Sequence, residues 1–236
     1  MEKAKNKKID IESVSDILET IYGKAISGVN LISPPVEDVA ESYLKKYPVP
    51  AIAAKKMLNN QVLKCTTSGF VTGLGGVITL ATTLPLNITS VIYVQVRMIA
   101  CTAYMAGCDL NDDQVQTLIY ACLAGVAVNE LVKKTGLRFG EKIATNLIKK
   151  IPGEVFTKIN KKIGFRFITK CGEKGVINMG KLIPGVGGIL GGGFDLIETR
   201  IIANRAYRWF FENDFSVNNI RDDEADFIDV GEDEEK

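Results

Sequence analysis

Apolar residues recur every three or four positions along much of the chain, the spacing that places them on one face of a helix. Val14, Ile17 and Ile21 show this spacing first, before two consecutive prolines interrupt it. Prolines, glycines and capping residues divide the rest of the pattern. The predicted helices cover residues 9–29, 36–47, 51–65, 69–83, 87–106, 140–151, 154–171 and 195–209, and one more follows a capped turn at residues 109–113 and runs through Val126. The sequence therefore predicts an all-α, multi-helix domain.

Two glycine-rich apolar stretches stand out within this pattern. Residues 65–96 form a run of 32 without a charged side chain, longer than the roughly 20 residues that span a bilayer. A second stretch begins near Gly175 and ends where Asp195 starts a helix. Glycines four residues apart let helix backbones approach closely, in a soluble core or in lipid. We expect two central helical hairpins, buried in protein rather than in lipid, because polar residues such as Arg97 are costly in a bilayer.

Charge separates the chain into regions. Residues 133–174 hold twelve Lys and Arg against three acids, whereas residues 212–236 hold eleven acids against two bases. The acidic end is poor in apolar residues, which is typical of disorder. We expect N-terminal helices over residues 1–50, a helical core domain over residues 51–212 and an acidic, disordered tail over residues 213–236.

The predicted helix at residues 154–171 is basic and amphipathic. Its apolar positions line one side, and its basic positions form a candidate lipid-surface face made of Lys158, Lys161, Lys162, Arg166 and Lys170. Basic and apolar faces side by side suit an anionic membrane surface. The alternative is a solvated face on a helix that covers the core. Nucleic acid is not an expected partner, because the aromatic residues fall within the apolar pattern.

The residue inventory argues against familiar enzyme classes. The chain contains no histidine, which excludes His-based zinc sites and Ser-His-Asp or Cys-His catalysis. Its five cysteines include no CxxC pair and indicate a reducing compartment. The glycine clusters lack a GxGxxG or phosphate-loop continuation, and the Asp109–Asp112–Asp113 turn lacks EF-hand spacing. We expect no cofactor and no metal, and no catalytic residue can be named.

Arg97 is the most informative single residue, because an arginine in a long apolar helix needs a partner. The candidate buried polar cluster consists of Gln95, Arg97, Asp195 and Glu198. We favour a buried ion pair between Arg97 and one of the two acids. An anion-binding arginine is the alternative.

Several glycine patterns resemble those of the EcsC family of bacterial proteins. The likeness spans roughly residues 51–209 and is carried by residues 68–80, 84–85, 94–100, 144–147, 164–166, 172–175, 183–188 and 193–195. The family takes its name from a gene beside an ABC transporter. The resemblance implies a helical, glycine-rich bacterial protein with a link to membranes, and it supplies no catalytic residues.

Three function classes follow. We favour a non-enzymatic protein that is cytoplasmic and peripheral to the inner face of the cell membrane, accessory to transport or stress response. Its expected partner is the anionic membrane surface, with a membrane-protein partner and the oligomeric state left open. The alternatives are an effector whose hairpins insert into membrane on a trigger, and an enzyme with an unrecognised site around Arg97, Asp195 and Glu198.

Overall fold

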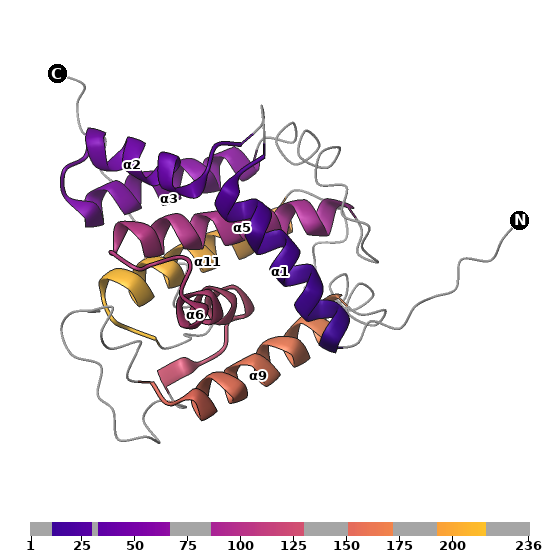
Figure 1. The fold of residues 1–236 in the computed structure, drawn as a ribbon. Helices are drawn as coiled ribbons and strands as arrows, with labels where there is room; N and C mark the ends of the chain where they lie inside the picture. The colour runs from indigo at the N-terminus through magenta and orange to yellow at the C-terminus, as the bar shows by residue number, and fades with distance from the viewer. Residues whose placement is uncertain (1–10, 30–32, 67–85, 130–150, 172–192, 216–236) are drawn as a thin grey trace, which may run out of the picture.

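The computed structural model describes residues 11–29, 33–66, 86–129, 151–171 and 193–215, and these are mostly helical (Figure 1). The described helices are α1 (Ile11–Ser27), α2 (Val36–Lys46), α3 (Pro50–Thr66), α5 (Leu86–Met105), α6 (Asp113–Ala124), α9 (Gly153–Cys171) and α11 (Gly193–Phe211). Within these ranges no strand forms beyond an isolated bridge between Val29 and Ser33. The all-α prediction is confirmed for this part of the chain. The second helices of the two predicted hairpins correspond to α5 and α11. The glycine-rich first halves of the hairpins, at residues 67–85 and 172–192, and the predicted helix at residues 140–151 lie outside the described residues.

Helix α5 lies at the centre of the described part. It contacts α1, α2, α3, α6 and α11, and every residue from 92 to 103 is buried except Arg97, which is half-buried. A helix that is apolar around its whole circumference is stable only when other elements cover every side. The long uncharged run that the sequence shows is therefore protein core from residue 90 onward, as far as the structure describes it.

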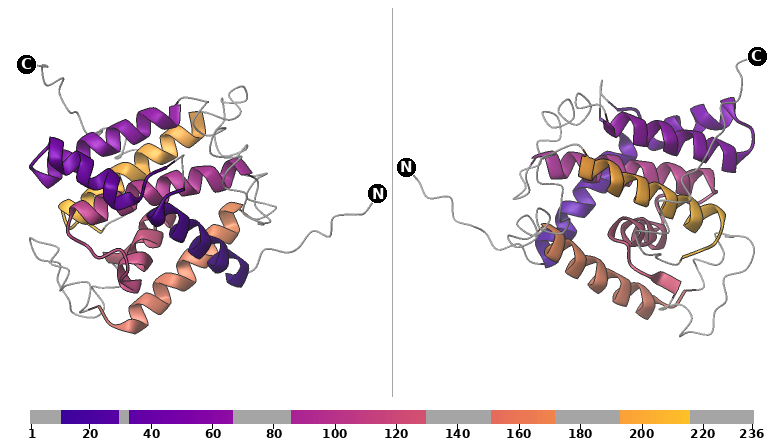
Figure 2. Two further views of the ribbon diagram at one scale, coloured as in Figure 1. Left: turned by 45° about the horizontal axis from the view of Figure 1, so that its top comes forward. Right: turned by 180° about the vertical axis from the view of Figure 1, so that it is seen from behind.

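The other helices form layers around α5. Helices α2 and α3 lie on one side of it, and α6 and α9 lie on the other (Figures 1 and 2). Helix α1 contacts both α5 and α9, so it joins the two sides. Buried residues of α1, α2, α3, α5, α6, α9 and α11 belong to one hydrophobic cluster. The N-terminal helices and the rest of the described chain thus share a single core.

The link between α1 and α2 depends on a glycine. Gly28 has φ +76°, a conformation that costs an L-residue roughly 1–2 kcal/mol. A Cβ at Gly28 would also lie 2.4 Å from the carbonyl oxygen of Ser33. The backbones of Val29 and Ser33 exchange two hydrogen bonds of 2.8 and 2.9 Å, which hold this turn closed.

Capping residues set the ends of α6 as the sequence predicts. The Asp112 carboxylate accepts a hydrogen bond of 2.8 Å from the Gln114 amide, satisfying one of the free donors of the first turn. Gly125 ends the helix in the left-handed conformation. Gly107 (φ +85°) likewise follows the end of α5. The predicted turn at residues 109–113 is confirmed.

The chain remains packed for a short distance beyond α11. Phe215 is buried and its ring lies 5.3 Å from that of Trp209, which is also fully buried. Asp214 forms an ion pair with Arg208. The boundary expected at residue 213 therefore falls inside the packed structure. The remainder of the acidic region, residues 216–236, lies outside the described residues.

Candidate functional site

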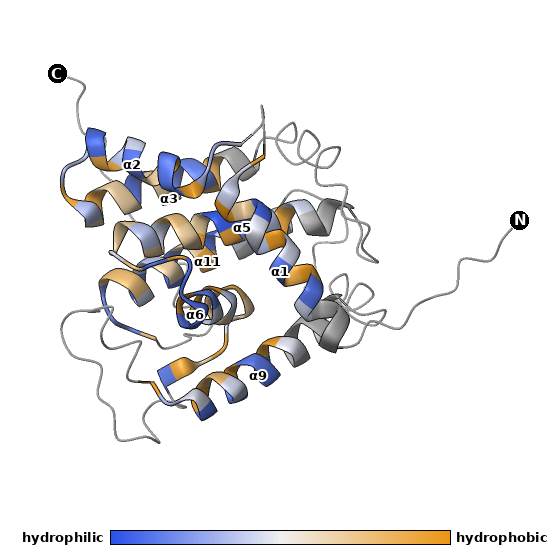
Figure 3. Cartoon of the chain, in the orientation of Figure 1, coloured by the Kyte–Doolittle hydropathy of each residue, from blue (hydrophilic) through white to orange (hydrophobic). Residues whose placement is uncertain are grey.

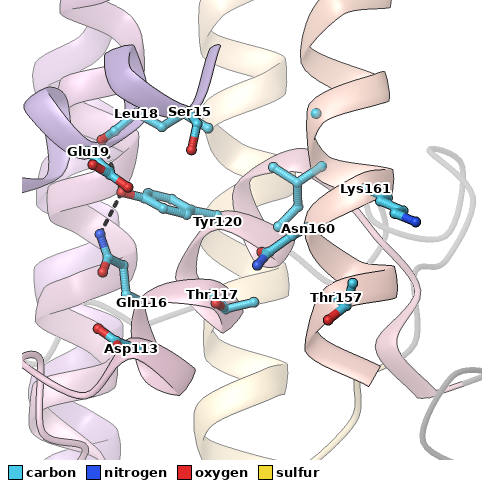
Figure 4. Close-up of a pocket in the computed structure, with 12 residues that line it drawn as sticks. Ser15, Leu18, Glu19, Asp113, Gln116, Thr117, Tyr120, Thr157, Asn160 and Lys161 are labelled. Atoms are coloured by element: carbon cyan, nitrogen blue, oxygen red, sulfur yellow. Dashed lines mark hydrogen bonds between the residues drawn. The ribbon is translucent and has the colours of Figure 1, made fainter. Parts of the chain in front are cut away.

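A groove opens between α1, α6 and α9, with a volume of about 510 Å³ (Figure 4). Small-molecule sites usually measure about 300–1,000 Å³, so the groove is of a size to hold one. Its position follows from the fold, because α9 contacts both α1 and α6 and leaves a concave space where the three helices meet.

Tyr120 forms the most buried polar part of the groove. Its hydroxyl donates to the Leu18 carbonyl at 3.0 Å and accepts from the Gln116 amide at 2.8 Å. Its ring meets the edge of Tyr22 with centroids 5.6 Å apart, and the Tyr22 hydroxyl donates to the Leu110 carbonyl at 2.7 Å. Burial raises the pKa of the Tyr22 and Tyr120 hydroxyls above the ordinary value for tyrosine. Both tyrosines are therefore neutral and structural at physiological pH.

Neutral polar side chains line much of the rest of the groove. The hydroxyls come from Ser15, Thr117 and Thr157, and the amides from Gln116 and Asn160. In Figure 4 Asn160 points from α9 toward α6. Such groups donate and accept hydrogen bonds but do not transfer protons near neutral pH. The interior of the groove therefore offers neutral hydrogen-bonding groups.

Charged residues lie at the rim of the groove. Glu19 and Asp113 are exposed on one side, and Lys161 is exposed on α9, with its ammonium group directed away from the groove in Figure 4. Among the described residues no group of three or more Asp, Glu, Cys or His side chains could hold a metal ion.

The basic face of α9 is exposed while its apolar face is buried. Lys158, Lys161 and Lys162 face solvent. Val155, Phe156, Ile159 and Ile163 are buried on a helix that contacts α6 and α1. The alternation of apolar and charged positions is visible in Figure 3. The side chains of Arg166 and Lys170 lie outside the described residues. The described half of α9 can therefore offer its charges to a partner, but its apolar side chains are already occupied by the core.

Gln95 of the candidate polar cluster is buried and faces α11. Its amide nitrogen lies 3.2 Å from the Thr199 hydroxyl oxygen, and both residues are at most 2% exposed. This hydrogen bond joins the central helix to α11 within an otherwise apolar contact. A buried amide without such a partner would cost roughly 1–3 kcal/mol.

Arg97 faces the opposite side of α5. Two residues along a helix rotate a side chain by ~200°, so Arg97 and Gln95 leave α5 in different directions. The Arg97 guanidinium donates to the Ala25 carbonyl at 2.7 Å and to the Pro34 carbonyl at 2.6 Å, and it lies 5.6 Å from the centroid of the Tyr93 ring. Arg97 thus ties the end of α1 and the start of α2 to the central helix.

The two acids of the cluster, Asp195 and Glu198, lie in the first turns of α11. Their side chains fall outside the described residues. An ion pair between either acid and Arg97 therefore stays a prediction. The partners that the structure gives Arg97 are backbone carbonyls, which the spacing of residues along the sequence cannot reveal.

Three cysteines are buried in the core. Burial raises the pKa of Cys101, Cys108 and Cys122 to about 12 in each case. A thiol with so high a pKa is a poor nucleophile and packs as a small apolar group. These residues are therefore not candidates for catalysis or redox sensing.

The groove was not anticipated from the sequence. Its lining residues come from three helices that are separated in the chain, and they include both exposed and buried positions of those helices. The contact between Tyr120 of the groove and Tyr22 joins residues 98 positions apart, so no local pattern signals it.

No family model, no curated protein and no solved structure matches this chain. None of the described helices combines the length and the hydropathy needed to cross a bilayer.

Proposed function

We propose that this is a non-enzymatic protein that binds peripherally to the anionic surface of a membrane through the lysine face of α9, at the cytoplasmic side of the bacterial cell membrane. The observation that carries the proposal is the exposure of Lys158, Lys161 and Lys162 on one helix. None of the three forms an ion pair with another described residue.

The buried face of α9 determines the kind of binding. An amphipathic helix that inserts into lipid must have its apolar side available. Here Ile159 and Ile163 are in the core, so the contact is electrostatic and leaves α9 in place. A lysine near an anionic surface strengthens binding about fivefold, and that attraction decays over roughly 10 Å at 0.1 M salt. Arg166 and Lys170 continue the same basic pattern along the sequence.

The resemblance to the EcsC family is part of this proposal. It supports a bacterial origin, a link to membranes and an accessory role in transport or stress response, which leaves room for a membrane-protein partner. Many of the residues that carry the likeness lie in the two glycine-rich stretches. We propose that these stretches form packed helical hairpins, with close helix contacts at Gly69 and Gly73 and at Gly188 and Gly192.

Sedimentation with lipid vesicles tests the proposal. The protein should bind vesicles that contain phosphatidylglycerol and dissociate from them as the salt concentration rises. It should not bind vesicles of phosphatidylcholine alone. Replacing Lys158, Lys161 and Lys162 together by Gln should weaken binding several-fold at each salt concentration. Asn160→Gln is the matched control, because it changes the same helix without changing charge. Equal binding to neutral and anionic vesicles would contradict the proposal.

The same vesicles separate the other two function classes. Release of an encapsulated dye would favour a trigger-dependent effector whose hairpins insert into lipid, in place of a peripheral protein. An enzyme around Arg97, Asp195 and Glu198 is less well supported, because the Arg97 guanidinium already donates to two backbone carbonyls.

A further inference from the structure

Exposed aliphatic side chains gather where α2 turns into α3. Among the described residues the large exposed hydrophobics are Val49, Ile52 and Leu63, at 52%, 45% and 63% exposure. Two of the three lie within four residues of each other. Pro48 and Pro50 beside them are also exposed. We call residues 45–56 the α2–α3 corner.

Backbone hydrogen bonds at both helix ends fix the conformation of the α2–α3 corner. The Tyr47 amide donates to the Tyr43 carbonyl at 2.7 Å and closes α2, and the Ala53 amide donates to the Val49 carbonyl at 2.9 Å and opens α3. Directly after the tip, Ala53, Ala54, Met57 and Leu58 are buried. Val49 and Ile52 are therefore held outward between two anchored helices.

Lysines flank this apolar tip along the chain. Residues 42–60 contain four lysines and no acidic residue. Lys45 is largely exposed and forms a 3.6 Å ion pair with Glu41 one turn back. Lys46 lies 5.5 Å from the Tyr47 ring, and Lys55 lies 4.7 Å from the Tyr207 ring of α11. Two lysines therefore precede the tip along the chain and two follow it.

We propose that the α2–α3 corner is a membrane contact that inserts Val49 and Ile52 into the boundary between headgroups and acyl chains of an anionic bilayer. The lysines then lie at the level of the lipid phosphates, since a lysine can keep its stem in an apolar region and its ammonium in water. A bilayer explains the composition better than a protein partner does. Protein interfaces are depleted in lysine and bury about 800 Å² on each side, far more than two aliphatic side chains supply.

The corner is distinct from the lysine face of α9. Helix α9 and the helices that form the corner lie on opposite sides of α5 (Figures 1 and 2). The inference shares with the proposed function the anionic bilayer as partner, and it adds a second site with an apolar component. The two can therefore fail separately.

Binding measurements isolate the corner when the α9 contact is removed. In a protein that carries Gln at Lys158, Lys161 and Lys162, Val49→Gln with Ile52→Gln should weaken the remaining binding to phosphatidylglycerol vesicles about tenfold. Leu63→Gln is the matched control, because Leu63 is an even more exposed aliphatic residue near the other end of α3. It should leave binding unchanged. Unchanged melting temperatures show that each variant is folded.

Fluorescence reports insertion directly. The chain has a single tryptophan, Trp209, which is fully buried, so Val49→Trp adds an exposed reporter. Lipids with brominated acyl chains should quench it, and should not quench the reporter of Leu63→Trp. Absence of quenching while the protein sediments with vesicles would overturn the proposal. Protection of the Val49→Trp reporter from acrylamide without vesicles would also overturn it, because the corner would then be covered by another part of the chain or by a second copy.

The combined results distinguish the two sites. If the protein with Gln at the three α9 lysines binds like the wild type, and the protein with Gln at Val49 and Ile52 does not, the α9 contact is wrong and the corner is supported. The reverse result overturns the corner and supports α9. If the wild-type protein does not bind anionic vesicles, both are wrong.

Discussion

Arg97 contributes to the fold by connecting three segments through one side chain. Its guanidinium satisfies the Ala25 and Pro34 carbonyls at the point where Gly28 allows the chain to turn tightly. Arginine suits this role because its planar group presents several donors in fixed directions. A lysine has one charged nitrogen and cannot reach two separated carbonyls with the same geometry.

Arg97→Met should therefore destabilise the protein by about 2–4 kcal/mol, because two carbonyls lose charge-assisted hydrogen bonds. Urea denaturation measures the change. Arg97→Lys should recover part of the loss. Combining Arg97→Met with Asp195→Asn or Glu198→Gln in double-mutant cycles tests the predicted ion pair, since coupling beyond about 0.5 kcal/mol requires contact. Unchanged stability with lost vesicle binding would instead make Arg97 a binding residue.

Alkaline pH should destabilise the protein through its buried thiols. Burial raises the folded-state pKa of Cys101, Cys108 and Cys122 to about 12, from the ordinary value of 9. The folded state thus holds protons that the unfolded state releases, so stability is intact below pH ~9 and falls as pH rises toward 12. Buried Tyr22 and Tyr120 act in the same direction at higher pH. Denaturation midpoints measured from pH 7 to 11 give the dependence of stability on pH. Cys122→Ala should make stability depend less steeply on pH. A midpoint at pH 11 equal to that at pH 7 would contradict the expected loss of stability.

At the scale of helices, the sequence predicts what depends on local pattern. The predicted ends of the helices at residues 36–47, 51–65, 87–106 and 154–171 agree with α2, α3, α5 and α9 to within one residue. Prolines, caps and glycines act on their own neighbours, so they can be recognised without a tertiary structure. The groove and the carbonyl partners of Arg97 could not be predicted in this way, because they depend on how separate helices pack.

The end of the packed structure beyond α11 also could not be predicted from local sequence pattern. Phe215 lies in a stretch whose acidity predicts a tail, yet it packs on Trp209. Removing residues 216–236 should leave the melting temperature nearly unchanged. Removing residues 213–236 should lower stability by about 3–5 kcal/mol, the usual cost of deleting a buried aromatic side chain. Thermal unfolding of both truncations, with Phe215→Ala in the full chain as a control, measures the difference. Equal melting temperatures for the two truncations would show that Phe215 contributes little.

At the scale of the whole molecule, the arrangement of the two basic surfaces matters more than either alone. Helix α9, which carries one of them, and helices α2 and α3, which form the corner, lie on opposite sides of α5 (Figures 1 and 2). Two separate contact surfaces allow one molecule to bind two membranes at once. The formal net charge of +1 hides this arrangement, because the acids lie largely elsewhere in the chain.

Two separate membrane contacts predict that the protein joins vesicles together. Dynamic light scattering should show clusters of phosphatidylglycerol vesicles when the protein is scarce relative to lipid surface. Excess protein should disperse them, because each vesicle then carries its own bound molecules and no bare surface remains to bridge. Substituting Gln at the three α9 lysines, or at Val49 and Ile52, should abolish clustering while part of the binding persists through the other site. Clustering that survives both sets of substitutions would mean that self-association, and not two-sided binding, brings the vesicles together.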